Sequence, residues 1–179
     1  PGRAACLARE LSLCQGELPS AALRRELLTR DLAGEEAGAR ALAARALGAI
    51  GNVEDVQRLI ELCAPEETGE VQRSALAALS GTASEHAGLW RAAAEALLAG
   101  AGEARTRETA AVVLGRRPSS DAAPALTRAL LDSDWTVAAC AAVSLGMSRA
   151  ASALVPLREL TRHEDWRLRG AAVVGLGHL

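Results

Sequence analysis

Residues 132–146, DSDWTVAACAAVSLG, and residues 163–177, HEDWRLRGAAVVGLG, decide the fold of this chain. Each places Asp-Trp before an Ala-rich run that closes on Leu-Gly. Three earlier runs close on Leu-Gly or Leu-Ser, and the five endings are Leu47-Gly48, Leu79-Ser80, Leu114-Gly115, Leu145-Gly146 and Leu176-Gly177. The steps between the leucines are 32, 35, 31 and 31 residues. A period near 32 residues predicts a repeat array, in which one supersecondary unit stacks on copies of itself.

The composition favours helices in every repeat. Apolar residues make up 50% of the 179 positions, and the chain has no Phe or Tyr and only three Trp. Ala and Leu, which dominate the apolar runs, are strong helix formers, whereas strands prefer β-branched and aromatic residues. Because a core of Ala and Leu is thin, the helices must approach closely, as stacked helix pairs do.

Aligned on the closing leucine, the five runs predict the second helix of each repeat. Four residues before the leucine stand Ala43, Ala75, Ala110, Ala141 and Ala172, and eight before it stand Ala39, Val71, Thr106, Val137 and Leu168. These spacings place both positions on the face of the leucine, so we expect a buried stripe. We expect Thr68, Asp134 and Asp165 to cap helix N-termini, and the Gly after each leucine to end its helix.

Shorter periodic segments between these runs predict the first helices of each pair. They cover residues 20–32, 52–63, 84–98, 121–131 and 150–161, and residues 3–14 are expected to form a second helix left from an earlier, truncated repeat. The prediction is one all-α domain over 1–179, a solenoid of about five helical pairs plus that N-terminal helix. Since the chain begins at Pro1 and ends directly after a repeat signature, we expect a fragment of a longer protein.

Residues 121–137 and 154–169 carry the most specific pattern, with Asp-Ala-Ala-Pro or Val-Pro followed by Asp-Trp. This pattern resembles the HEAT repeat, in the short bacterial form related to the phycobilisome-lyase HEAT-like repeats. The resemblance implies a right-handed superhelix in which an Asp before the second helix and an Arg inside it join successive repeats. That Arg position, seven before the leucine, carries Arg40, Gln72, Arg107, Ala138 and Arg169. Asp165 and Arg169 are spaced for a local ion pair.

Enzymes with related repeats provide alternatives that the residues do not support. The deoxyhypusine hydroxylases hold two irons with four His-Glu pairs, whereas this chain has one, His163-Glu164, besides His86 and His178. The alkylpurine DNA glycosylases need a basic face with aromatics, but the net charge here is −2. Bilin lyases are closest in repeat style, although no residue marks their chemistry. We expect no catalytic residue, metal or cofactor.

The compartment is predicted from the cysteines and from hydropathy. Cys6, Cys14, Cys63 and Cys140 are widely spaced and form no C-x-x-C pair, which favours reduced, structural thiols in a cytoplasmic protein. No apolar run reaches the length of a membrane span, so a membrane partner is not expected.

The remaining candidate residues predict a protein-binding surface. Polar positions of the second helices form a modestly basic row expected on the concave side: Arg40, Arg45, Gln72, Arg73, Arg107, Glu108 and Arg169. Trp90, Trp135 and Trp166 are candidate aromatic anchors, but packing of Trp135 and Trp166 against the next repeat is the favoured interpretation. Arg40, Arg107 and Arg169 are likewise expected to form hydrogen bonds between repeats. The predicted function is a non-catalytic scaffold for a protein partner or for the rest of a parent chain. The alternatives are an accessory or lyase-like role in chromophore or cofactor attachment and, less favoured, nucleic-acid binding.

Overall fold

The computed structural model describes residues 32–50, 53–81, 87–116 and 119–179. These residues contain helices and turns but no strand, and the chain divides into two compact units, 1–90 and 91–179. In the first unit, α3 (Ala37–Ile50) and α4 (Val53–Glu61) both pack against α5 (Gly69–Ser80). The boundary between the units falls within α6 (Ala87–Ala99).

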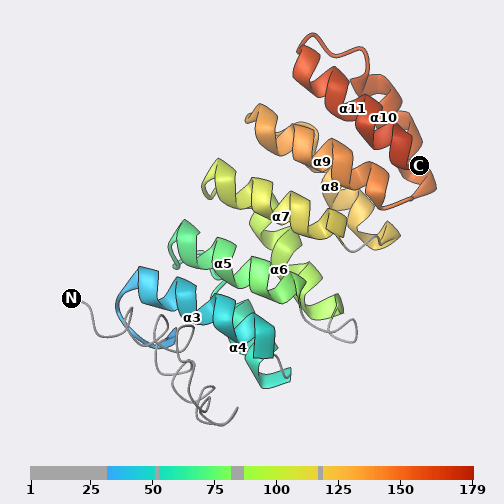
Figure 1. The fold of residues 1–179 in the computed structure, drawn as a ribbon. Helices are drawn as coiled ribbons and strands as arrows, with labels where there is room; N and C mark the ends of the chain where they lie inside the picture. Colours follow the sequence, from blue (N-terminus) through green and yellow to red (C-terminus); the bar gives the residue numbers. More distant parts are fainter. Residues whose placement is uncertain (1–31, 51–52, 82–86, 117–118) are drawn as a thin grey trace, which may run out of the picture. The chain divides into compact units, whose positions relative to one another are not determined.

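The second unit consists of two layers of helices. Helices α7 (Ala104–Arg116), α9 (Trp135–Met147) and α11 (Trp166–His178) lie side by side in Figure 1 and form one layer. Short helices α8 (Ala123–Ala129) and α10 (Leu154–Leu160) pack against α9 and α11 and form the other. Each short helix is preceded by a 3₁₀ turn, 120–122 and 151–153.

The predicted helix register is confirmed by burial. All five alanines that precede the closing leucines are completely buried. Leu47, Leu79, Leu114 and Leu145 are at most 1% exposed, and Leu176 is half-buried. The residues eight positions before the leucines are also all buried. The alanine keeps the facing helix close and the leucine fills the next layer, so the thin Ala–Leu core is packed as the sequence predicts.

The predicted second helices are α3, α5, α7, α9 and α11, and four predicted first helices correspond to α4, α6, α8 and α10. The predicted and observed ends of these four helices differ by at most four residues, because helix ends are where sequence signals are weakest. The helices expected over 3–14 and most of 20–32 lie outside the described residues. The handedness of the superhelix stays a prediction.

Two of the predicted N-caps form and one does not. The carboxylate of Asp134 accepts a hydrogen bond from the Thr136 amide at 2.8 Å, and that of Asp165 accepts one from the Arg167 amide at 2.9 Å. Thr68 occupies the N-cap position of α5 with an extended backbone, but its side chain makes no cap hydrogen bond. The prediction that the Thr68 side chain caps α5 is therefore wrong.

The prediction that Gly after the leucine ends each helix is also wrong. Gly115 and Gly146 lie inside the last turns of α7 and α9 and are buried. A Cβ added to Gly146 would overlap the carbonyl of Gly175 in α11 and lie 2.6 Å from its Cα. One added to Gly175 would lie 2.5 Å from the carbonyl oxygen of Ala142. These glycines let the backbones of α9 and α11 approach, which is a packing role rather than a helix stop.

Candidate interaction surface

Three arginines of the predicted row hold the loops before their own helices. Nη1 of Arg40 donates to the carbonyl oxygens of Gly34 and Glu35 at 2.8 and 3.0 Å. Arg107 donates in the same way to Gly102 at 2.5 Å. Arg169 donates to the carbonyl oxygens at positions 163 and 164. Because a guanidinium presents several fixed donors, one side chain can donate to the carbonyl oxygens of the loop and still have donors left for a second partner.

The second partner of two of these arginines is a carboxylate from the following repeat. Arg40 forms an ion pair with Glu67 at 2.8 Å. Arg107 donates from Nε and Nη2 to the two oxygens of Asp132 at 2.7 and 2.9 Å, and this pair lowers the pKa of Asp132. The expected hydrogen bonds between repeats are thus present for Arg40 and Arg107. The charges of Arg40 and Arg107 are therefore largely neutralised by carboxylates of the protein itself.

The other members of the row differ in how far their side chains are exposed to solvent, and so to a partner. Gln72 is buried, and its Nε2 donates to the carbonyl oxygen of Ala64 at 2.8 Å, so it joins α5 to the preceding loop. Arg45 is exposed on α3, whereas Arg73 on α5 and Glu108 on α7 are half-buried. Four of the seven row residues lie in the first unit and three in the second. Whether they bind a partner stays a proposal.

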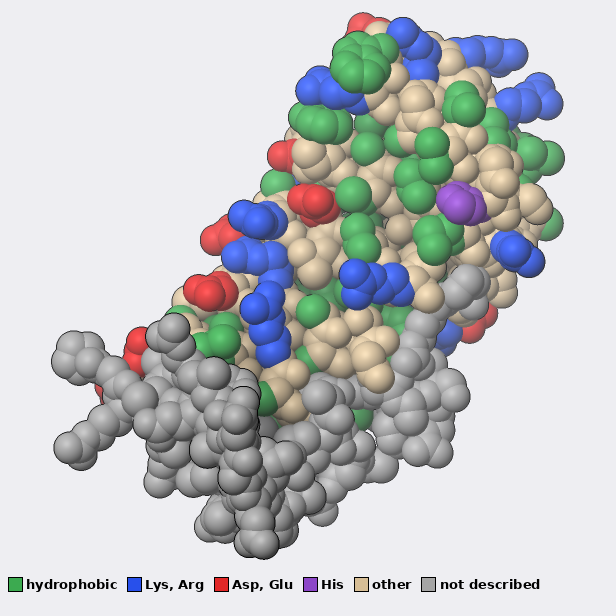
Figure 2. All heavy atoms as spheres, viewed as in Figure 1, with side chains coloured by type: hydrophobic (Ala, Val, Ile, Leu, Met, Phe, Trp, Pro, Cys, Tyr) green, Lys and Arg blue, Asp and Glu red, His purple; other side chains and the backbone are tan. Residues whose placement is uncertain are grey.

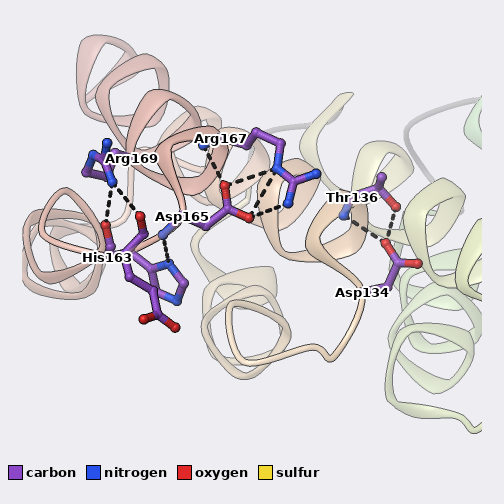
Figure 3. A network of polar contacts seen from close by, with 7 residues as sticks. Asp134, Thr136, His163, Asp165, Arg167 and Arg169 are labelled. Carbon is purple, nitrogen blue, oxygen red and sulfur yellow. Dashed lines mark hydrogen bonds and ion pairs between the residues drawn. The ribbon is translucent and has the colours of Figure 1, made fainter.

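The loop before α11 is held by a network centred on Asp165 (Figure 3). Arg167 donates to the Asp165 carboxylate from its backbone amide and, at 2.6 Å, from Nη2. These hydrogen bonds hold the pKa of Asp165 at about 2. The Asp165 amide in turn donates to Nδ1 of His163 at 3.0 Å. The expected Asp165–Arg169 pair is therefore not formed, because Arg167 is closer to the carboxylate and Arg169 points at the loop carbonyls.

The three tryptophans lie in different environments. Trp90 is 2% exposed within α6 and belongs to the core. Trp135 and Trp166 begin α9 and α11 and leave 43% and 73% of their surface exposed. The guanidinium of Arg167 lies 4.1 Å from the centroid of the Trp135 ring, so Trp135 contacts the next repeat through a cation–π pair. Only Trp135 and Trp166 present ring surface to solvent.

A groove of about 680 Å³ lies beside Trp135, between the loop that follows α8 and the loop that follows α10. Its floor is apolar and includes Leu130, Leu160 and Leu168, which are at most 9% exposed. Leu131, at one side of the groove, is 89% exposed. The sequence analysis did not select Leu131. The equivalent residue one repeat later is Arg162, and this difference between repeats could have indicated that position 131 is exposed.

Large apolar side chains are exposed elsewhere in the second unit too. Val173 and Val174 of α11 are 61% and 51% exposed, and Leu154 and Val155 of α10 are 51% and 63% exposed. Figure 2 shows hydrophobic side chains gathered over α9 and α11, with charged side chains along their borders. The second-helix layer of this unit therefore offers apolar contact area beside its polar row.

Within the described residues, no group of three or more His, Cys, Asp or Glu side chains is arranged to hold a metal ion. Cys63 is a buried free thiol whose pKa burial raises to about 12, and Cys140 is a half-buried free thiol. Cys6, Cys14 and His86 lie outside the described residues. No helix of the described ranges has the length and apolar character needed to cross a membrane.

Comparison with known proteins agrees with the repeat pattern. Residues 91–177 match the model of the HEAT repeats family. A chain from the complex of CpcE and CpcF of phycocyanin lyase from Nostoc sp. PCC7120 is similar in fold, with 20% identity, a TM-score of 0.71, and coverage of 93% of this chain and 67% of that one.

An engineered protein is also similar in fold, with 21% identity, a TM-score of 0.63, and coverage of 98% of this chain and 87% of that one. No curated protein matches the chain by sequence. The two-layered helical repeats, their buried Ala–Leu register and the family match lead to one conclusion. Residues 91–177 of this chain are HEAT repeats, and they make up nearly all of the second unit.

Proposed function

We propose that this chain is a non-catalytic scaffold that binds a protein partner through apolar side chains of its second unit. The observation that carries the proposal is the exposure of large apolar groups there: Leu131, Trp135, Leu154, Val155, Trp166, Val173 and Val174 are all between 43% and 89% exposed. Clustered exposed apolar surface is typical of protein interaction sites, and Trp is enriched where binding energy concentrates.

Two further observations support a protein partner. The arginines that bind loop carbonyls and carboxylates stiffen the repeats, so the exposed groups are presented on a rigid surface, and such a surface loses little conformational entropy on binding. The phycocyanin lyase structure that this fold resembles is itself a complex of two proteins. The prediction of a cytoplasmic setting is kept, with the free thiols of Cys63 and Cys140 in its support.

Affinity capture from a lysate of the source organism, with this chain as bait, tests the proposal. We expect one protein to be captured by the wild type and to be depleted at least about tenfold by the double substitution Trp166→Ser and Val173→Ser, since both side chains are exposed and truncation removes contact area rather than core. Leu42→Ser, an apolar-to-serine change in the first unit, is the matched control. Capture that is equal for all variants, or the absence of any captured protein, would overturn the proposal.

The similarity to phycocyanin lyase favours a second candidate, an accessory role in chromophore or cofactor attachment. A bilin carries propionate carboxylates, and the groove beside Trp135 is itself lined by carboxylates, so the charges do not match there. Titration of a bilin with the protein separates the two functions. A saturable change in the bilin absorbance spectrum would support the second candidate, and an unchanged spectrum would remove it.

A further inference from the structure

The groove beside Trp135 has the chemistry of a peptide-binding site. It combines an apolar floor with one aromatic wall, and its volume of about 680 Å³ accommodates a bulky side chain with its flanking backbone. The wall is Trp135, a residue that is 43% exposed, and Leu131 adds apolar surface to the lining. Leu131 is 89% exposed and therefore adds little to the packing of the repeat.

Contacts within the protein hold this wall in place. The ring of Trp135 is covered on one side by the Arg167 guanidinium at 4.1 Å. The carboxylate of Asp165 holds that guanidinium by accepting hydrogen bonds from Nε and Nη2 of Arg167 (Figure 3). Asp165 also caps the N-terminus of α11. A ligand thus meets a ring whose orientation is already set, which reduces the entropy lost on binding.

The charged residues that line the groove are all acidic. Its charged lining residues are Asp132, Glu159, Glu164 and Asp165, and the lining contains no Lys or Arg. Arg107 and Arg167 neutralise Asp132 and Asp165. The carboxylates of Glu159 and Glu164 are exposed and form no ion pair with the described part of the chain, so they leave net negative charge at the rim. A positively charged ligand group is attracted there.

We propose that this groove binds a partner segment in which a bulky apolar side chain is flanked by Lys or Arg. The apolar side chain packs on the Trp135 ring and the floor, and the flanking cations pair with Glu159 and Glu164. This proposal rests on the scaffold function and names the partner chemistry for one of its surfaces.

Selection from a library of random peptides of about twelve residues, displayed on phage, tests the proposal with the full chain as target. The expected result is enrichment of peptides that carry a large apolar residue beside Lys or Arg. Enrichment of acidic peptides, or no enrichment over a blank surface, overturns it.

The enriched peptide is then synthesised with a fluorophore, and its affinity is measured by anisotropy. We expect Trp135→Ala to weaken binding by about 30-fold or more, and Glu159→Gln with Glu164→Gln by about 3- to 10-fold, with the second loss fading at high salt. Leu42→Ala and Glu66→Gln are matched controls, because both residues are exposed and neither lines the groove. The two glutamates are exposed, so that variant reports on the groove even if Trp135→Ala perturbs folding.

Analytical ultracentrifugation distinguishes a second copy of this chain as the occupant. Concentration-dependent dimerisation that Trp135→Ala abolishes would overturn the peptide proposal. If capture of a protein from lysate needs Trp166 and Val173 but is unaffected by Trp135→Ala, the scaffold function stands and the groove proposal fails. If no protein is captured at all, the scaffold function itself fails.

Discussion

The close approach of α9 and α11 predicts that Gly146→Ala destabilises the protein. A Cβ at Gly146 would overlap the carbonyl oxygen of Gly175. It would lie 2.5 Å from the carbonyl carbon of Gly175 and 2.6 Å from the Cα of Gly175. The obstacle is backbone, which cannot rotate away as a side chain does, so the two helices must separate. Overpacking of this kind costs about 1–3 kcal/mol, and the upper end applies to a rigid obstacle.

The gain in helix propensity offsets part of this cost. Replacing Gly by Ala inside a helix stabilises it by about 1 kcal/mol. The net effect expected for Gly146→Ala is therefore a loss of about 2 kcal/mol of unfolding free energy. For a chain of this length, the expected fall in melting temperature is roughly 4–8 °C.

Gly170→Ala is the matched control in α11. Apart from the adjoining residues and backbone of α11 itself, no atom lies within 4 Å of a Cβ built at Gly170, which is exposed, so only the propensity gain remains. We expect Gly170→Ala to stabilise the protein by about 0.5–1 kcal/mol. Urea and thermal unfolding followed by circular dichroism measure both variants. A Gly146→Ala protein as stable as the wild type would refute the backbone contact between α9 and α11.

Three other perturbations have expected outcomes. Ala141→Leu should cost about 1–3 kcal/mol because Ala141 is completely buried between helices, and an unchanged thermal melt would contradict the helix register. The pKa of Asp165 is about 2 in the folded chain against an ordinary value of 3.8, so its stabilising effect is present above about pH 4 and is lost as pH falls from 4 to 2. Asp165→Asn keeps an N-cap residue but removes the titration, and a stability profile over pH 2–5 that equals the wild type would count against the pair with Arg167. Cys63, with its pKa raised to about 12 by burial, should resist iodoacetamide at pH 8 in the native protein and react in urea, as peptide mass spectrometry can follow; rapid native labelling would contradict its burial.

Local patterns carried much of the fold. The Ala–Leu spacing defined the buried stripe of every second helix, and Asp134 and Asp165 were predicted as caps because a short acceptor before an apolar run satisfies free helix amides. Thr68 shows the limit of such signals, since a residue type suited to a cap occupies the position without making the bond.

The candidate site was less predictable because its groups come from different repeats. The sequence marked Arg107 as a residue that joins repeats, and the structure pairs it with Asp132. The sequence also predicted that Trp135 contacts the next repeat. It did not predict that Arg167 covers the Trp135 ring or that Leu131 is exposed beside a groove. These relations depend on how one loop is placed against another, which no local spacing encodes.

The amino-acid sequence by itself determined that this protein is a stack of helical pairs, because a helix buries residues three and four apart and the chain repeats that pattern about every 32 positions. Only the tertiary structure decided which helix backbones are in contact and which charged side chains are paired within the protein. Gly146 was expected to end a helix but admits α11, and Asp165 was expected to pair with Arg169 but binds Arg167. Periodicity specifies which face of a helix is buried, whereas the distance between two helices and the partner of each side chain are set by the packing of the repeats against one another.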